Sequence, residues 1–486
     1  MIASFGLLLS RTIGRFMPDP FLLAILLSIV AATLAATLGT SGADGGSPPG
    51  TELLASWWSQ GVWGLLAFSM QMCLILVTGS AVAESPIVSR GLARIAAWPA
   101  SMTSAAALVA AVAIAAGLLN WGLGLVVGAI LARETARSLV DRGIACHYPL
   151  LAACGYLAMI VWHGGFSGSA PLSMTTVAGA SKVIPADVLA TLAAADGAAL
   201  DADGTLPLSQ TLLSPLNLVA TGGLAIGLPL LMSMLAPRDA KAMASPTDLG
   251  IELGRDRVAA AARGGRSTER NLAADAVDRN DDGGLLSKSL AILLGVAFVG
   301  GFLQWALRDG LGRLGLDQVN AFMLGAGLLL HGSALAYARA VERAARGCAG
   351  IMIQFPLYAG ILGLLRESGL LAEFATSIAQ RADESTLPLL TLLSAGLVNL
   401  FVPSGGGQWA VQGPIALAAG AESGVAPGTM TMAVAYGDQL TNMLQPFWAL
   451  PLLAITGVRA RDLVGYTALA MVAALAWLLL VLFVLG

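Results

Sequence analysis

The sequence predicts an all-α, polytopic membrane protein, and its composition and hydropathy carry this prediction. Of the 486 residues, 57% are hydrophobic and only 11% are charged, whereas ordinary soluble domains carry about 25% charged residues. The mean hydropathy is +0.78. Apolar runs of about 20 residues, the length that a helix needs to cross the hydrocarbon core, recur along nearly the whole chain. The composition therefore excludes a soluble fold and makes the lipid bilayer an expected partner.

The apolar runs between charge clusters define the expected membrane segments. We predict segments at residues 20–38, 61–83, 102–132, 147–171, 213–236, 288–306, 318–335, 348–365, 387–420, 429–452 and 463–485. The runs at 102–132 and 387–420 are too long for one crossing, and each is interrupted near its middle by a stretch with Asn and Gly. We therefore expect two helical hairpins, each entering and leaving by the same side.

Lys and Arg accumulate in cytoplasmic loops and so report the orientation of the chain. With the N-terminus inside, the cytoplasmic segments hold all of the 26 Lys and Arg residues except Lys182, Arg308, Arg313, Arg366 and Arg381. This asymmetry predicts a multi-pass protein of the bacterial inner membrane with a cytoplasmic N-terminus. The near-neutral charge of -3 and the lack of a basic stripe argue against nucleic acid as a partner.

Three pairs of landmarks recur in the same order in the two halves of the chain. The pairs are Gln71 and Gln354, Asn120 and Asn399, and Pro171 and Pro451, separated by 283, 279 and 280 residues. We therefore predict two membrane repeats, each with a hairpin and a broken helix. An extra crossing between the repeats would invert the second relative to the first.

The predicted organisation has four parts. Residues 1–236 form the first repeat, with its hairpin near 102–132, and residues 237–287 form a flexible cytoplasmic linker rich in charged and small residues. Residues 288–306 form a connecting transmembrane helix, and residues 318–486 form the second, inverted repeat, with its hairpin near 387–420. Secondary carriers often use inverted repeats and hold the ligand near the bilayer midplane, where broken helices meet.

The first candidate binding segment is the stretch from Trp162 to Pro171, which interrupts an apolar run. Its glycines and serines disfavour a helix, and an unwound backbone at membrane depth has to line a cavity or be buried in protein. We predict a ligand cradle here, with a small-residue packing seam as the alternative. The candidate residues are His163, Gly164, Gly165, Ser167 and Ser169; His163 could titrate or donate to an anion.

The second candidate binding segment lies at the bend of the second hairpin. Consecutive glycines let successive N–H groups point into one concavity, and the start of the returning helix adds a positive dipole end, so the segment suits a carboxylate. The alternative is a plain turn that needed glycine. The candidate residues are Ser404, Gly405, Gly406, Gly407 and Gln408, with Gln412 one turn further on.

Asp438 is the one acidic residue that we place well inside a predicted span. A charged side chain at the bilayer centre costs at least about 2.5 kcal/mol, so such a residue is a functional candidate by default. We predict that Asp438 binds a coupling cation or carries a proton, with a structural pairing as the alternative. Asn442 and Gln445 follow at i+4 and i+7 and are expected on the same helix face.

Four isolated amides complete the candidate set. Asn120 and Asn399, at the hairpin bends, could bind a carboxylate or cap the broken helices. Gln71 and Gln354 lie in apolar spans, where bonds between helices are at least as good an explanation as ligand contact. We find no metal-ligand spacing and no Ser/His/Asp grouping, so we expect no catalytic residues, no metal, no cofactor and no enzyme activity. The four cysteines are scattered singly and are expected to be packing residues.

Five motifs resemble those of the bacterial short-chain fatty acid transporter family, which includes acetoacetate and butyrate permeases. They are Met17-Pro-Asp-Pro20, Asn120-Trp-Gly-Leu-Gly-Leu-Val-Val-Gly128, Gly164-Gly-Phe-Ser-Gly-Ser169, Val402-Pro-Ser-Gly-Gly-Gly407 and Gln445-Pro-Phe-Trp-Ala-Leu-Pro451. The resemblance implies ion-coupled uptake of short monocarboxylates on a scaffold with inverted repeats, and a possible homodimer. The chain departs from the family pattern at His163, where a third glycine is usual, and at Asp438, where a glutamate is common.

The leading hypothesis is thus a secondary active transporter, a symporter for a small carboxylate substrate such as acetoacetate or butyrate, coupled to H⁺ or Na⁺. A dicarboxylate carrier or a cation/proton antiporter of the same superfamily is the alternative, although the chain has no Arg cluster for a second carboxylate. A channel would need a continuous polar pore, and a membrane enzyme would need an acid/base or metal set.

Overall fold

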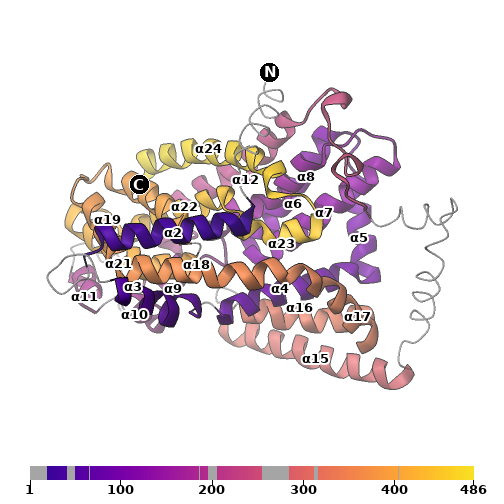
Figure 1. The fold of residues 1–486 in the computed structure, drawn as a ribbon, viewed down its shortest axis with the longest axis horizontal. Coiled ribbons are helices and arrows are strands. Elements are labelled where there is room, and N and C mark those ends of the chain that lie inside the picture. Colours follow the sequence, from indigo (N-terminus) through magenta and orange to yellow (C-terminus); the bar gives the residue numbers. More distant parts are fainter. Residues whose placement is uncertain are drawn as a thin grey trace.

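The computed structural model describes residues 19–40, 50–64, 66–184, 186–194, 205–253, 284–310, 316–402 and 404–486. Every regular element within these ranges is a helix, which confirms the all-α class (Figure 1). The motif residues 17 and 18 and the predicted linker residues 254–283 lie outside the described ranges.

Six of the described helical segments are long and apolar enough to cross a membrane, and a bent pair, Ser69–Val82 with Pro86–Ala96, would make a seventh. The six segments are Pro20–Leu38, Met102–Leu119, Tyr148–Ser173, Pro215–Leu235, Gly284–Asp309 and Ala460–Leu485. Each starts within a few residues of a predicted span. The chain is therefore a multi-pass membrane protein, as its hydropathy predicts.

The first half has the helices α2 (Pro20–Leu38), α3 (Gly50–Ser56), the π-helix η1 (Trp57–Val62), α4 (Leu66–Glu84), α5 (Pro86–Ala96), α6 (Met102–Leu119), α7 (Trp121–Asp141), α8 (Tyr148–Tyr156), η2 (Leu157–Ile160), η3 (Trp162–Gly164), α9 (Ser169–Ser173), α10 (Val177–Val183), α11 (Ala186–Ala194), η4 (Leu208–Gln210) and α12 (Pro215–Leu235). Asn120, with φ −159° and ψ 132°, separates α6 from α7. The two arms pack along each other, so the predicted interruption of 102–132 is present.

The second half has α18 (Ala349–Glu367), α19 (Leu370–Ala379), α20 (Leu387–Asn399), α21 (Gly405–Ser423), α22 (Pro427–Thr441), η9 (Asn442–Leu444), α23 (Pro446–Thr456) and α24 (Ala460–Leu485). The two halves share one order of helices, which starts at α4 in the first half and at α18 in the second. In each half a helix pair is followed by an interrupted pair, a broken span and a long helix. In this half α20 packs mainly against α22. A Cβ at Gly437 would overlap the carbonyl oxygen of Leu392, so glycine permits this close contact. That the second half is inverted stays a prediction.

Between the halves lie η5 (Ala240–Ala242), η6 (Thr247–Leu249), α15 (Gly284–Asp309), α16 (Leu316–His331), α17 (Ala334–Ala345) and η8 (Arg346–Cys348). Helices α15 and α16 pack on each other at the lower edge of Figure 1, and α16 packs on α4. The predicted connecting helix at 288–306 is thus present as α15, which is four residues longer at its start and three at its end.

The start of the predicted linker is held against the membrane helices. The backbone N–H of Tyr148 donates to the carbonyl of Ala244 (2.9 Å), and the N–H of Ala244 donates to Nδ1 of His147 (2.9 Å). Farther along, the Arg137 guanidinium donates to the carbonyl of the buried Leu253. Residues 237–253 therefore form a docked segment, which low hydrophobicity alone did not predict because its anchors are backbone groups.

The broken span Tyr148–Ser173 lies at the centre of the molecule. In its most apolar stretch 94% of the residues are buried, against 11% in α15. A Cβ at Gly128 of α7 would overlap the carbonyl oxygen of Gly155, so these glycines let α7 and α8 approach to backbone contact. The broken span is consequently fixed by packing on the first hairpin.

A single methyl group tests this packing. Gly128→Ala should lower the thermal unfolding midpoint of the detergent-solubilised protein, because overpacking of this kind costs about 1–3 kcal/mol. Gly227→Ala in α12 is the control, since its Cβ would meet no atom within 4 Å. Equal midpoints for the two variants would show that the contact between α7 and α8 is not tight.

Candidate functional site

The two broken spans meet at their interruptions. Helix α22 packs on η3 and α9, and η2 packs on η9. The hydroxyl of Tyr156, at the end of α8, donates to the carbonyl oxygens of Asn442 (2.8 Å) and Gln445 (3.2 Å). One side chain of the first broken span thus bonds to two backbone groups of the second, and we call this contact region the crossing. We call the stretch from Trp162 to Pro171 the first break.

The second broken span turns where its sequence forbids a continuous helix. Helix α22 ends at Thr441, Asn442–Leu444 form a 3-10 turn, and Gln445 is extended (φ −90°, ψ 113°). Pro446 lacks an N–H and opens α23 at its first turn, where no donor is needed. The prediction that Gln445 shares a helix face with Asp438 is therefore wrong, because the helix stops before it.

Gln439 holds the backbone of the first break. Its Oε1 accepts from the N–H groups of His163 (3.1 Å) and Gly164 (3.3 Å). On the other side, Nδ2 of Asn217 donates to the carbonyl oxygen of Gly164 (2.9 Å). A Cβ at Gly164 would overlap Thr221, and one at Gly165 would overlap the carbonyl of Leu118. The predicted glycines are therefore required because the first break lies directly against α12 at Gly164 and against α6 at Gly165.

Asp438 and His163 form a buried pair at the centre of the crossing. Nδ1 of His163 lies 3.2 Å from Oδ1 of Asp438, and the two side chains are 1% and 2% exposed. The imidazole stacks on Trp162, with ring centroids 4.0 Å apart and planes 16° apart. Its Nε2 accepts from the N–H of Ala170 (3.2 Å). Because Nε2 is used as an acceptor, the ring proton of the neutral imidazole is on Nδ1, facing Asp438.

The glycine-rich bend of the second hairpin faces the first break. Ser404 caps α21, its Oγ accepting from the N–H of Gly407 (3.2 Å). Gly405 packs on the first break, since its Cβ would lie 2.8 Å from Trp162 and 2.9 Å from His163. Gly406 is exposed, and its Cβ would lie 3.9 Å from Cβ of Ser169. The N–H groups of Gly405 and Gly406 open the helix and have no intrahelical acceptor, so they suit an anion.

Asn399 joins the second hairpin to the second broken span. Its Nδ2 lies within bonding distance of the Asp438 carbonyl oxygen (2.7 Å) and Oδ1 of Asn442 (2.8 Å). Nε2 of Gln445 donates to the carbonyl of Asn399. Three predicted residues, Asn399, Asn442 and Gln445, therefore gather behind Asp438.

Many buried side-chain atoms at the crossing and in the two hairpins have no hydrogen-bond partner among the described residues. They are Nδ2 of Asn120, Nε1 of Trp162, Nδ1 of His163, Oδ1 of Asn399, Oε1 of Gln408, Nε1 of Trp409, Oδ2 of Asp438, Nε2 of Gln439, Nδ2 of Asn442 and Oε1 of Gln445. An unsatisfied buried polar group costs about 1–3 kcal/mol, and such groups are rare in native proteins. Their concentration here suits a site for a polar ligand, an ion or water.

Other predicted site residues cap a helix or join helical segments. Oδ1 of Asn120 accepts from the N–H groups of Gly122 (2.9 Å) and Leu123 (3.2 Å) and so caps α7. Oγ of Ser167 accepts from the N–H of Trp121 (3.0 Å). These contacts support the capping interpretation of Asn120 and tie the first hairpin to the first break.

The remaining glutamines lie within helix contacts. Nε2 of Gln408 donates to Oε1 of Gln412 (2.7 Å), inside the second hairpin. Nε2 of Gln71 donates to Oδ1 of Asp317 in α16 (2.6 Å), a bond between helices. Gln354 is buried in α18, and no described bond joins Gln71 or Gln354 to the crossing.

Sequence reasoning missed Gln439, Asn217, Tyr156 and Tyr436. Tyr436 donates to Oδ1 of Asn217 (3.0 Å) and links α22 to α12. Asn217 is a lone amide in an apolar span. The same signal identified Gln71 as a candidate, so Asn217 could have been found from the sequence. Gln439 adjoins Asp438 but points to a different face, while Tyr156 has no sequence signal.

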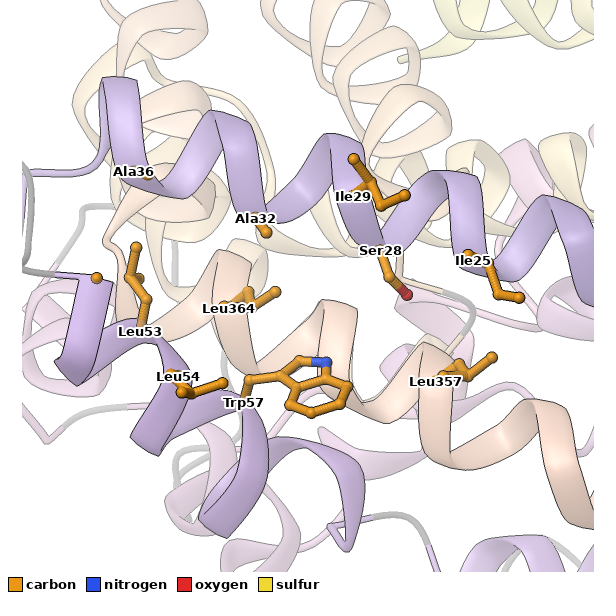
Figure 2. A pocket seen from close by; sticks show the side chains of 11 residues that line it. Ile25, Ser28, Ile29, Ala32, Ala36, Leu53, Leu54, Trp57, Leu357 and Leu364 are labelled. Atoms are coloured by element: carbon orange, nitrogen blue, oxygen red, sulfur yellow. The ribbon is translucent and has the colours of Figure 1, made fainter.

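Two pockets show where an apolar tail or chain could lie. One, of about 220 Å³, adjoins the first break and is lined by Leu118, Gly164, Gly165, Phe166, Leu212, Leu213, Asn217, Leu218, Thr221 and Gly222. The other, of about 470 Å³, lies between α2, α3, η1 and α18, with Trp57 at its floor (Figure 2). Its lining is almost entirely apolar, with Ser28 as the one hydroxyl residue, so it does not suit a carboxylate.

No group of three or more His, Cys, Asp or Glu side chains that could hold a metal ion occurs in the described part of the chain. All four cysteines are buried and free of disulfide bonds.

Comparison with known proteins gives a consistent result over the whole chain. The family described as "Short chain fatty acid transporter" matches residues 1–485. A Haemophilus influenzae protein named "Putative short-chain fatty acid transporter" is 34% identical over 482 residues, covering 97% of each chain. An Escherichia coli protein of the same name is 35% identical over 471 residues, covering 96% of each. The solved structure of the Alcanivorax borkumensis YdaH transporter is 19% identical, with a TM-score of 0.43, and covers 96% of this chain and 97% of that one.

A hydroxyl deletion tests the crossing. Tyr156→Phe removes the hydroxyl that bonds to the carbonyl oxygens of Asn442 and Gln445, and the Asn442 carbonyl keeps only the N–H of Gln445 (3.1 Å). The change should therefore destabilise the protein by about 1 kcal/mol. Tyr337→Phe is the matched control, because the Tyr337 hydroxyl is buried with no partner in the described residues. Thermal unfolding in detergent compares the two. A loss for Tyr337→Phe as large as that for Tyr156→Phe would contradict the role given to Tyr156.

Proposed function

Because this chain belongs to the short chain fatty acid transporter family, we propose that it is a secondary active transporter of small monocarboxylates such as butyrate and acetoacetate. The observation that carries the proposal is the crossing, where the N-terminal glycines of α21 face the first break beside a buried Asp438. The related proteins are named as transporters, which supports a transport role and gives no support to an enzyme.

The substrate carboxylate is placed between Gly406 and Ser169. Free N–H groups and the positive end of the α21 dipole attract an anion there, and the Ser169 hydroxyl can donate to it. The aliphatic tail then lies near Phe166 and the pocket of about 220 Å³. A water molecule takes up about 30 Å³ in the liquid, so this pocket has room for a molecule the size of butyrate.

The negative charges of the substrate and of Asp438 support coupling to a cation. The anion site adjoins His163, which lies 3.2 Å from Asp438, so a bound carboxylate would bring a second negative charge close to the first. Like charges in a low-dielectric interior repel strongly. Asp438 is therefore proposed to bind the coupling cation, which neutralises it when the substrate arrives.

A single carboxylate fits better than two. In the described residues, no Lys or Arg forms an ion pair with a residue of the crossing; the one ion pair there joins His163 and Asp438. A dicarboxylate would carry a second anionic group with nothing to balance it. The proposal also includes a cytoplasmic N-terminus in a bacterial inner membrane, supported by the distribution of Lys and Arg, and a homodimer, supported by the family resemblance alone.

Uptake of labelled butyrate, acetoacetate, acetate and succinate into proteoliposomes tests the function. Butyrate and acetoacetate should accumulate and succinate should not. Gly406→Ala adds a methyl group where the structure leaves room but where the carboxylate binds, so KM for butyrate should rise about tenfold, a loss of about 1.4 kcal/mol. Gly227→Ala is the control, and an unchanged KM in Gly406→Ala would place the carboxylate elsewhere.

Asp438→Asn tests the coupling role. The amide keeps the shape of the carboxylate but cannot hold a cation or a proton, so gradient-driven accumulation of butyrate should fall to the level of protein-free vesicles. Exchange of internal for external butyrate should persist, because it needs no net movement of the coupling ion. Full accumulation by Asp438→Asn would rule out this role.

A further inference from the structure

We propose that the coupling ion is a proton, taken up by Asp438 beside His163, and that Na⁺ has no site at the crossing. This inference rests on the proposed function and goes further, because it names the ion and assigns His163 a part in coupling. Three observations carry it, namely the occupied carbonyl groups at the breaks, the tautomer of His163 and the balance of charge.

The carbonyl oxygens that a Na⁺ ion would use are already hydrogen bonded. Carriers that bind Na⁺ at broken helices coordinate it with unwound backbone carbonyls and helix C-termini. Eight carbonyls in the two broken spans and in α20 instead accept from side chains. The pairs are Gly164 with Asn217, Ala395 with Gln408, Gly396 with Thr441, Asp438 with Asn399, Asn399 with Gln445, Met443 with Thr467, and Asn442 and Gln445 with Tyr156.

A hard cation at the crossing would therefore have to share these oxygens with the donors that already bond to them. Each hydrogen bond weakened in this way loses part of what a buried hydrogen bond provides. A proton needs none of these oxygens, because it forms a covalent bond with one carboxylate atom. Oδ2 of Asp438 is buried and has no partner in the described residues, so it is available to receive one.

The tautomer of His163 directs the proton to Asp438. Nε2 of the imidazole is taken by the N–H of Ala170 (3.2 Å), so the ring already carries its proton on Nδ1. A second ring proton, on Nε2, would point toward the N–H of Ala170, and the two donors would repel each other. The Nδ1–H of His163 faces Oδ1 of Asp438 from 3.2 Å, so the carboxylate is the group of this pair with an oxygen open to a further proton.

Other titratable groups near the pair are neutral under ordinary conditions. On α8 and α22 these are the phenols Tyr156 and Tyr436 and the thiol Cys154, while α20 and α9 have none. Tyr148 begins α8, and on α24 Tyr466 bonds to His147 while Arg461 pairs with Asp462 near the helix start. The acidic residue of α21, Glu422, lies at its far end. Asp438 is thus the one fixed negative charge at the crossing in the described residues.

The balance of charge sets the stoichiometry. One proton from water on the uptake side bonds to Oδ2 of Asp438 as one carboxylate binds, and both leave on the other side, where the proton returns to water. The loaded crossing carries only the charge of the substrate, so one proton and one monocarboxylate cross together and no net charge moves.

Calorimetry on the purified wild-type protein in detergent tests the ion directly. Butyrate is titrated at one pH in two buffers with different ionisation enthalpies, with and without Na⁺. We expect about one proton to be taken up for each butyrate bound, and a dissociation constant that Na⁺ leaves unchanged. Binding without proton uptake, or affinity that rises with Na⁺, would overturn the proposal while leaving carboxylate transport intact. Absence of any butyrate binding would instead refute the proposed function, and this inference with it.

Variants of His163 test its part in coupling. His163→Phe keeps a ring to stack on Trp162 but removes both nitrogen atoms, so the pH midpoint of gradient-driven uptake should move away from that of the wild type, because the N–H that faces Oδ1 of Asp438 is lost. His163→Asn restores a donor near the Nδ1 position and should return the midpoint toward that of the wild type. A purely structural role would lower the maximal rate of both variants and leave their midpoints unchanged. If His163→Phe does not fold, a midpoint for His163→Asn far from that of the wild type contradicts the proposal.

Discussion

The burial of Asp438 sets the condition that the rest of the crossing has to meet. A carboxylate 2% exposed in the middle of a membrane protein is tolerated only when neighbouring groups offset its desolvation. Here the imidazole of His163 lies 3.2 Å from the carboxylate, and the imidazole is in turn fixed by Trp162 and by the N–H of Ala170. Because His163 and Ala170 belong to the first break and Asp438 to α22, one buried charge holds the two halves of the protein in contact.

This contact also explains why both halves are interrupted. A continuous helix satisfies its own backbone, so it offers no N–H or carbonyl to a ligand or to another segment. At the crossing the freed groups are taken by Gln439, Asn217, Tyr156 and Asn399, whereas the first N–H groups of α21 remain available. The pattern separates backbone groups that fix the structure from those that suit an anion.

The sequence predicted the breaks well and their partners poorly. Glycine, serine and asparagine inside apolar runs indicate interruption whatever the surroundings, so Asn120, Gly164 and Gly405 were found. Whether an amide faces the ligand, a helix or the backbone depends on contacts between segments more than 200 residues apart. For Gln71 the sequence left a bond between helices and a ligand contact as alternatives, and the structure shows the first, a bond to Asp317. Tyr156 had no sequence signal, although its hydroxyl bonds to two carbonyl oxygens. The docking of segment 237–253 was not predicted for the same reason, since the segment bonds to the membrane helices through its backbone groups.

The central claim is that the substrate carboxylate binds between Gly406 and Ser169. Substrate protection of a thiol placed there tests it most directly, using the Ser169→Cys variant and a small alkylating reagent. Gly227→Cys in α12 is the control, because this position is exposed and its Cβ would meet no atom within 4 Å. The account predicts that butyrate slows alkylation at position 169 in a saturable manner and leaves position 227 unaffected. If butyrate binds and alkylation at position 169 proceeds at an unchanged rate, the crossing is not the substrate site.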